Sequence, residues 1–270
     1  MNAHSLGQPL ARGRTANVYA WEAGLVLKLF HDGFDRASIE YEAHIARAVH
    51  ACGLPVPAVG DLIHINGHVG LIYERVEGPS MLDLLQHNPW RLFEYAKRLA
   101  QLQAQMHTAR VQADLPAQRQ KLESKIRWAA ALPANAQTVA LAALASMPEG
   151  DQLCHGDLHP ANILVTAQGE VIIDWMDASR GNALADVART AIILLGAVQS
   201  DQLPNPVMKM VARVFQQAYL WAYLHLYSQG REEFQYWLPI VAAARLSENI
   251  PEVERWLVAQ ALRCKLRPRI

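Results

Sequence analysis

The sequence predicts an α+β fold of two lobes, with a small β-rich N-terminal lobe over residues 1–76 and a larger helical C-terminal lobe over residues 77–270. Short apolar runs separated by turn signals fill the first part of the chain, a pattern typical of strands. From Trp90 onward, apolar residues recur at the spacing of helices. The composition, 51% hydrophobic and 19% charged, suits a chain that buries a core.

The strands of the N-terminal lobe are expected as hairpins. Apolar runs over residues 17–21 and 24–30 are separated by a short turn. Residues 61–65 and 69–74 flank Asn66-Gly67, a dipeptide that favours a tight hairpin turn. Residues 38–52 read as a helix, with Ser38 as the N-terminal cap and Gly53 as the stop. A linker to the second lobe is expected near residues 73–78.

The C-terminal lobe is expected to be helical apart from one hairpin. Helices are predicted over residues 90–110 and 118–145, the latter broken at Pro133. Strands over residues 163–166 and 171–174 would turn at Gln168-Gly169. From Leu184 to the end, the pattern is helical, with interruptions expected at four prolines: Pro204, Pro206, Pro239 and Pro251.

Bulk properties argue against several classes of protein. The formal net charge is +0, whereas nucleic-acid binders usually carry a basic excess. The three cysteines are far apart, which argues against a disulfide framework or a zinc knuckle, and Cys154 is expected to be a small buried residue. Because no signal peptide and no apolar stretch long enough for a membrane span is seen, a cytoplasmic protein without membrane contact is expected.

The most informative segment is residues 155–165, which read HGDLHPANILV, followed by Asp174 in Ile-Ile-Asp-Trp. Phosphoryl transfer needs a carboxylate that orients the attacking hydroxyl and accepts its proton, and oxygen ligands for Mg²⁺. Asp157, Asn162 five residues later, and Asp174 at the end of a nearby strand supply this set. We expect Asp157 to be the catalytic base and Asn162 and Asp174 to be the metal ligands. A zinc site built from His155, Asp157 and His159 is the alternative, but it leaves Asn162 and Asp174 without a role.

These motifs together resemble the aminoglycoside phosphotransferase and choline kinase superfamily, whose members are small-molecule relatives of protein kinases. The resemblance implies a protein-kinase-like fold, ATP (GTP possible) and Mg²⁺ as cofactors, and a small-molecule hydroxyl acceptor. It also implies that His155 supports the catalytic loop, and that Asp186 steadies this loop by hydrogen bonds. A protein kinase is disfavoured, because no Ala-Pro-Glu segment and no long activation loop follow Asp174.

Further nucleotide contacts are expected in the N-terminal lobe. Lys28 lies in an otherwise apolar strand, where a buried lysine needs an anionic partner. By the resemblance, it would bind the α- and β-phosphates and pair with a helix glutamate, Glu42 in preference to Glu40. The turn at Gly13 would cover the phosphates, although it has one glycine where kinases have three. The linker would meet the adenine through its backbone, at Tyr73, Glu74, Arg75 and Val76.

The acceptor itself is left open by the sequence. An aminoglycoside-like antibiotic, an amino alcohol or a sugar all suit the resemblance. The segment from residue 201 to the end carries more basic than acidic residues, which gives no support to a strongly cationic acceptor. Five aromatic residues at helical spacing could form a cage for a quaternary ammonium, although core packing is the expected role: Phe215, Tyr219, Trp221, Tyr223 and Tyr227. A catalytically inactive nucleotide-binding pseudokinase is the alternative function.

Overall fold

The computed structural model describes residues 6–267, except 14, 66, 110–114, 201–202, 204 and 228–229. The chain separates into two compact units. The first unit comprises the described residues up to Met81 together with Ala161–Met176. The second comprises the described residues of Leu82–Val111, Leu115–Pro160 and Asp177 onward. The expected division at residue 76 into a nucleotide lobe and a catalytic lobe stays a prediction about function.

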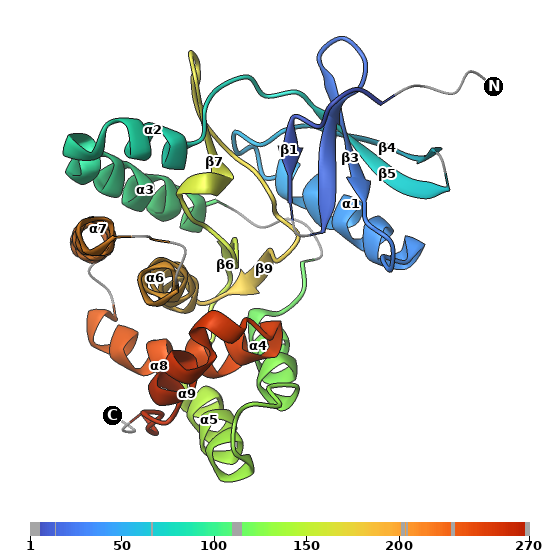
Figure 1. The fold of residues 1–270 in the computed structure, drawn as a ribbon. Helices are drawn as coiled ribbons and strands as arrows, with labels where there is room; N and C mark the ends of the chain where they lie inside the picture. The colour runs from blue at the N-terminus through green and yellow to red at the C-terminus, as the bar shows by residue number, and fades with distance from the viewer. Residues whose placement is uncertain are drawn as a thin grey trace. The chain divides into compact units, whose positions relative to one another are not determined.

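The first unit is built on a five-stranded antiparallel sheet in the order β1-β2-β3-β5-β4 (Figure 1). Its strands form from the alternating and apolar runs that the sequence displays. Both predicted hairpins are present, although Asn66 and residue 14 of the Gly13 turn lie outside the described residues. The strands are β1 Ala11–Arg12, β2 Ala16–Ala20, β3 Leu25–Phe30, β4 Val59–Ile65 and β5 His68–Glu74.

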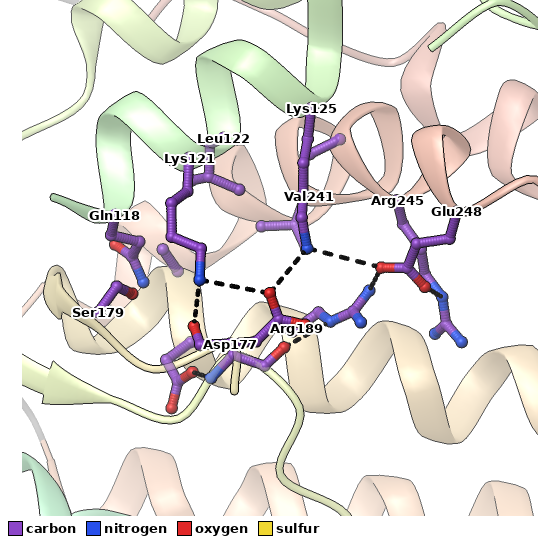
Figure 2. Close-up of a pocket in the computed structure, with 14 residues that line it drawn as sticks. Gln118, Lys121, Leu122, Lys125, Asp177, Ser179, Arg189, Val241, Arg245 and Glu248 are labelled. Carbon is purple, nitrogen blue, oxygen red and sulfur yellow. Dashed lines mark hydrogen bonds and ion pairs between the residues drawn. The ribbon is translucent and has the colours of Figure 1, made fainter. Parts of the chain in front are cut away.

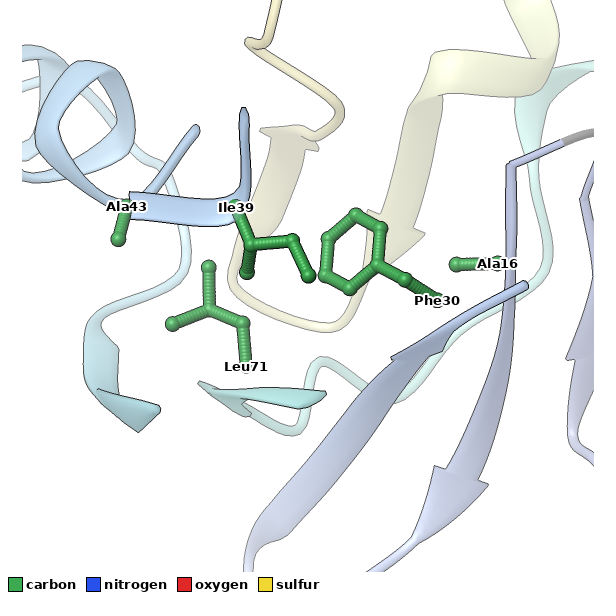
Figure 3. Close-up of a cluster of buried hydrophobic side chains, with 5 residues drawn as sticks. All are labelled: Ala16, Phe30, Ile39, Ala43 and Leu71. Carbon is green, nitrogen blue, oxygen red and sulfur yellow. The ribbon is translucent and has the colours of Figure 1, made fainter. Parts of the chain in front are cut away.

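Helix α1, Arg36–His50, is bound to this sheet by a small apolar core. Ile39 and Ala43 of the helix are buried with Phe30 and Leu71 of the sheet (Figure 3). The expected N-cap, Ser38, is wrong. Asp35 caps the helix, because its carboxylate accepts a hydrogen bond of 2.7 Å from the Ser38 N–H, and Ser38 lies inside the first turn.

The predicted hairpin after Asn162 also belongs to the first unit. Strands β7, Ile163–Thr166, and β8, Gly169–Ile172, pair antiparallel. The hairpin is attached by backbone hydrogen bonds from Val165 N–H to the Pro79 carbonyl and from Ile172 N–H to the Pro55 carbonyl. The expected strand over residues 171–174 is therefore two residues out of place, since β8 begins at Gly169 and ends before Asp174.

The second unit is mainly helical (Figure 1). Helices α3 and α7 pack along each other, α6 packs against both α7 and α8, and α4 and α5 pack on α8. Within the described ranges, no helix combines the length and apolar character needed to cross a membrane. A short antiparallel pair joins β6, Gln152–Cys154, to β9, Ser179–Gly181. The helices are α2 Met81–His87, α3 Leu92–His107, α4 Gln118–Arg127, α5 Ala134–Ser146, α6 Ala183–Gln199, α7 Pro206–Leu226, α8 Phe234–Arg245 and α9 Pro251–Ala261.

The prolines act differently from one another. Pro206 and Pro251 begin α7 and α9, where a proline needs no N–H partner. Pro239 was expected to interrupt a helix, but it lies inside α8. The helix continues because the residues after Pro239, among them Ile240 and Val241, are buried and packed, which offsets the hydrogen bond that proline cannot donate. Pro204 lies outside the described residues.

Candidate active site

The first unit places Lys28 between two carboxylates. Its Nζ lies 2.7 Å from Glu42 Oε1 on α1 and 3.2 Å from Asp174 Oδ1 after β8. The expected pairing of Lys28 with Glu42 is therefore confirmed. Glu40 instead forms an exposed ion pair with Arg36 one turn away on the same helix. A central lysine is thus held by a helix glutamate and a hairpin aspartate that are distant in sequence.

Lys28, Glu42 and Asp174 are coupled by their charges and by the burial of Lys28 and Glu42. The Glu42 side chain is only 3% exposed and also accepts a hydrogen bond of 2.9 Å from the Tyr73 hydroxyl. Burial on its own would lower the pKa of Lys28, but the carboxylates of Asp174 and Glu42 raise it overall. Lys28 therefore stays an ammonium at neutral pH. Burial and the Glu42 charge raise the pKa of Tyr73, so its hydroxyl stays a donor.

Asp174 and Asn162 are the two expected metal ligands, and one hydrogen bond links their segments. The Ile173 N–H donates to the Asn162 carbonyl at 3.0 Å, which ties the residue before β7 to the residue before Asp174. Asp174 has a φ of 62°, in the left-handed region that aspartate adopts more readily than most residues. The buried indole of Trp175 fixes this turn by donating to the Ile172 carbonyl at 2.9 Å. The strained turn leaves the Asp174 side chain 47% exposed.

This donor set fits Mg²⁺ in its chemistry. Among the residues that the structure describes, no group of three or more His, Cys, Asp or Glu side chains is placed to hold a metal ion, and the zinc alternative at His155 and His159 gains no support. Mg²⁺ is commonly bound by one or two protein oxygens, with water and phosphate oxygens completing the octahedron. One carboxylate at Asp174 and one amide at Asn162 match that requirement.

The four residues expected at the adenine lie at the end of β5. Tyr73 and Glu74 are the last strand residues and do not belong to a linker. The N–H groups of Glu74 and Arg75 donate to the carbonyls of Ala58 and Gly24, both at 2.9 Å. Val76 follows the end of β5, and its N–H makes no backbone hydrogen bond to the described residues.

The second unit contains Asp157, in a loop of residues 155–159 that we call the Asp157 loop. Asp157 Oδ1 accepts a hydrogen bond of 2.9 Å from Arg189 Nη2, and His159 Nε2 lies 3.7 Å from the other carboxylate oxygen. Burial on its own would raise the pKa of Asp157, but His159, Arg189 and His155 lower it overall, to well below the ordinary value. Asp157 is therefore a carboxylate over the whole neutral range. Its convergence with Asn162 and Asp174 stays a prediction.

Two side chains fix the backbone of the Asp157 loop by hydrogen bonds. The buried Asp186 accepts a hydrogen bond of 2.7 Å from the Gly156 N–H, and His155 Nδ1 accepts one of 3.1 Å from the Asp157 N–H. Gly156 has a φ of 79°, and a side chain there would come within 2.6 Å of the Asp177 carbonyl oxygen. The supporting positions expected for His155 and Asp186 are thus seen as hydrogen bonds.

A polar network continues from Asp186 into the helical core. Its Oδ2 accepts from Gln103 Nε2 at 2.8 Å and lies 3.1 Å from His107 Nε2. The Tyr219 hydroxyl contacts Gln103, and the Tyr223 hydroxyl contacts His107. Phe215, Tyr219 and Tyr223 are all buried, whereas Trp221 is 62% exposed, so the five aromatics do not form a cage. Core packing explains the buried three.

Arg189 is the functional candidate that the sequence interpretation missed. Besides Asp157, it contacts the Gly156 carbonyl through Nε at 2.8 Å and Glu248 Oε1 through Nη1 at 2.7 Å. The Arg189 side chain is 12% exposed and Glu248 is 13% exposed. Arg189 interrupts the apolar helix α6 three residues after Asp186, and this was the available signal, since a buried arginine needs an anionic partner.

The arginine lies at the edge of a pocket within the second unit (Figure 2). Lys121 and Lys125 of α4 point into this pocket from one side, and Asp177 and Arg189 face them. Glu248, in the short 3-10 helix Leu246–Glu248 after α8, lies at the far end of the pocket.

Cys154 directly precedes the Asp157 loop. Burial raises the pKa of its thiol, which makes it a poor nucleophile.

Comparison with known proteins agrees with this architecture. A thermostable aminoglycoside phosphotransferase APH(4)-Ia in ternary complex with AMP-PNP and hygromycin B is 16% identical over 97% of this chain and 92% of its own, with a TM-score of 0.63. A choline/ethanolamine kinase family protein from Mesorhizobium loti is 17% identical over 96% of this chain and 87% of its own, with a TM-score of 0.58. The amicoumacin kinase hAmiN in complex with AMP-PNP, Ca²⁺ and Ami is 16% identical over 94% of this chain and 86% of its own, with a TM-score of 0.53.

These similarities show the fold, which is the expected α+β, protein-kinase-like one. No curated protein matches the sequence significantly. The sequence model of the phosphotransferase enzyme family matches residues 7–237. Since this match spans most of the chain, the protein belongs to the phosphotransferase enzyme family.

Proposed function

We propose that the protein transfers the γ-phosphoryl group of ATP, with GTP as a possible substitute, to a hydroxyl group of a small molecule. The observation that carries this proposal is Lys28 between Glu42 and Asp174. Kinases need a strand lysine paired with a helix glutamate and an aspartate that binds Mg²⁺, and both must be in place for transfer. The exposed Asp174 carboxylate and the buried Glu42 fit these two roles.

In this proposal Lys28 binds the α- and β-phosphates, and the ends of β5 and of the following segment bind the base. Lys28 is then the cation that the phosphates meet, while Glu42 and Tyr73 keep it in place. The Val76 N–H would donate to the base. Asn162 and Asp174 would hold Mg²⁺, which offsets the charge of the phosphate oxygens. Residues 1–76 would thus bind the nucleotide, and residues 77–270 would supply the catalytic loop and the acceptor site.

Asp157 would orient the acceptor hydroxyl and accept its proton. The acceptor oxygen forms a bond to the γ-phosphorus as the bond to the β-phosphate oxygen breaks, and the proton passes to the Asp157 carboxylate. The low pKa of Asp157 makes it a weak base, so its contribution is mainly orientation, with the proton moving late. Arg189 keeps this carboxylate in one position.

The test is the Asp157→Asn variant in a nucleotide-consumption screen against hydroxylated metabolites and antibiotics. Turnover of the best acceptor is expected to fall about 10²- to 10⁴-fold, because the proton acceptor is lost. Mg²⁺-dependent stabilisation by nucleotide in a thermal melt is expected to remain. Asp151→Asn, at an exposed position just before β6, serves as the matched control. Full activity of Asp157→Asn would refute its role as the base.

The screen also separates a kinase from the pseudokinase alternative. Nucleotide stabilisation without turnover over a broad acceptor panel would favour a nucleotide-binding scaffold. Absence of Mg²⁺-dependent nucleotide stabilisation would contradict both functions, because both require the Lys28 site to bind phosphates.

A further inference from the structure

The lining of the pocket in the second unit contains more cations than carboxylates. Four positively charged side chains line it: Lys121, Lys125, Arg189 and Arg245. Two carboxylates face them, Asp177 and Glu248. Asp186 also lines the pocket, but its oxygens are directed at Gly156, Gln103 and His107. Even with Asp186 included, cations outnumber carboxylates along the described lining.

Each carboxylate in the pocket is shared by several cations. Asp177 Oδ1 lies 3.3 Å from Lys121 Nζ and 3.2 Å from Lys125 Nζ. Glu248 contacts Arg189 at 2.7 Å and Arg245 at 3.5 Å, and lies 3.9 Å from Lys125. Figure 2 shows these contacts as a chain of dashed lines across the pocket. Arg189 is also paired with Asp157 outside the lining. The excess of cations over carboxylates along the lining therefore rests on Lys121, Lys125 and Arg245, which share Asp177 and Glu248.

Burial makes this excess costly. The lysine side chains are 23% and 30% exposed, and Arg189 and Arg245 are 12% and 11% exposed. Burial lowers the pKa of Lys121, and the nearby charges of Lys125 and Arg189 lower it further, while Asp177 opposes them. A partly buried ion network of this kind seldom improves stability over apolar packing. An anion that enters the pocket would relieve the repulsion.

The pocket lies next to the proposed catalytic carboxylate. Gly156 lines it, and Arg189 reaches from its wall to Asp157 through the same guanidinium that contacts Glu248. Arg189 therefore links the lining of the pocket directly to the Asp157 carboxylate. Arg245 and Glu248 lie beyond residue 237, where the family match ends, so that match does not account for them.

We propose that this pocket binds a compact anionic group, a carboxylate or a phosphate, on the phosphate acceptor. Lys121 and Lys125 would bind it as point charges. Arg245, next to Glu248, adds a further cation. The acceptor is then an anionic hydroxy compound, such as a hydroxy acid or a sugar phosphate, whose hydroxyl lies a few bonds from its anion. This inference rests on the proposed function and narrows its acceptor class. It predicts poor use of cationic aminoglycosides.

The first test measures anion binding without any acceptor. Inorganic phosphate or acetate replaces chloride at constant ionic strength, and the melting temperature is followed as a function of anion concentration. A saturable rise is expected for the wild type. In the double variant Lys121→Gln, Lys125→Gln the apparent affinity is expected to fall about 10²- to 10⁴-fold, the size of two charge-assisted hydrogen bonds. The anion with the tighter response identifies carboxylate or phosphate as the group bound.

Two control variants separate the loss of the lysine charges from other effects of substitution. Lys121→Arg with Lys125→Arg keeps both charges and is expected to keep the response, which separates loss of charge from loss of folding. Arg127→Gln, an exposed cation on the same helix paired with Glu123, is expected to leave the response unchanged. An unsaturable rise, or a response that survives both glutamine substitutions, would overturn the proposal, because phosphate would then bind elsewhere, as at Lys28.

The second test uses the acceptor screen. The acceptor with the highest kcat/KM is expected to carry an anionic group, and converting that group to an amide or an ester is expected to lower kcat/KM at least about tenfold. A best acceptor that is neutral or cationic would refute this inference while supporting the proposed function. Saturable anion binding by Lys121 and Lys125, with no turnover of any acceptor, would support the pocket and count against the proposed function.

Discussion

In the first unit one ammonium group lies between two carboxylates, whereas in the second unit four cations face two. Lys28 is outnumbered by Glu42 and Asp174. Asp177 and Glu248, in contrast, are outnumbered by the lysines and arginines around them. The first cluster is short of positive charge, which the proposed Mg²⁺ would supply, and the second is short of negative charge. These opposite imbalances fit the two different ligands proposed above.

The largest change is expected from breaking the first cluster. Lys28→Met leaves Glu42 buried without its cation, and breaking a buried ion pair is strongly destabilising, so the free energy of unfolding should fall by about 3–5 kcal/mol. Nucleotide stabilisation should also disappear. Urea unfolding measures the first effect and thermal melts measure the second.

The exposed pair on the same helix provides the control for this change. Arg36 and Glu40 are 67% and 52% exposed, so Arg36→Gln should change the free energy of unfolding by less than about 1 kcal/mol. Equal losses in the free energy of unfolding for Lys28→Met and Arg36→Gln would show that burial of the Lys28 ion pairs adds nothing to stability. The contrast between the Lys28 cluster and the pocket of the second unit would then have no energetic basis.

A smaller effect is expected from removing the brace of the Asp157 loop. Arg189→Gln takes away the donor to Asp157 and leaves Glu248 without its closest cation, so turnover should fall about tenfold to hundredfold through misplacement of the carboxylate. The loss should lie mainly in kcat, which makes Arg189 a positioning residue. Arg213→Gln, at an exposed site on α7, is the matched control. A change in KM alone would assign Arg189 to acceptor binding instead.

The smallest effect is a pH dependence that Arg189 should control. The pKa of Asp157 is lowered in the folded protein, so its carboxylate stabilises the fold above the ordinary pKa, and this contribution is lost as the pH falls through the lower, folded value. The difference in free energy of unfolding between wild type and Asp157→Asn should therefore not shrink as the pH falls from about 7 to about 5. In an Arg189→Gln background the decline should begin at higher pH. A wild-type difference that already shrinks in this interval would contradict the lowered pKa.

Local patterns in the sequence predicted most of the fold. Both hairpins of the sheet, helix α1 and the hairpin after Asn162 follow from periodicity and turn residues. Apart from Pro239, which lies inside α8, the errors concern ends of elements. Asp35 replaces Ser38 as the cap because its carboxylate reaches the first turn from outside, and β8 ends early because Asp174 adopts a positive φ.

Only part of the candidate site was predicted, because some of its contacts join segments that are far apart in the chain. The contact of Lys28 with Glu42 came from a family pattern, and the structure contains it. The contacts of Arg189 with Asp157 and Glu248 join segments far apart in the chain, and no local periodicity encodes such pairs. A lone arginine in an apolar helix indicated that a partner exists, but its identity required the packing of α6 against α8.

The place of Glu248 in the chain has a consequence for biosynthesis. A ribosome that has made residues 1–240 has already released Asp157, Asp186 and Arg189, but not the glutamate that anchors the arginine. A nascent chain at that stage, or a product truncated there, would hold the guanidinium of Arg189 without its closest carboxylate. The closest anchor of Arg189 is therefore present only after Glu248 itself has been translated.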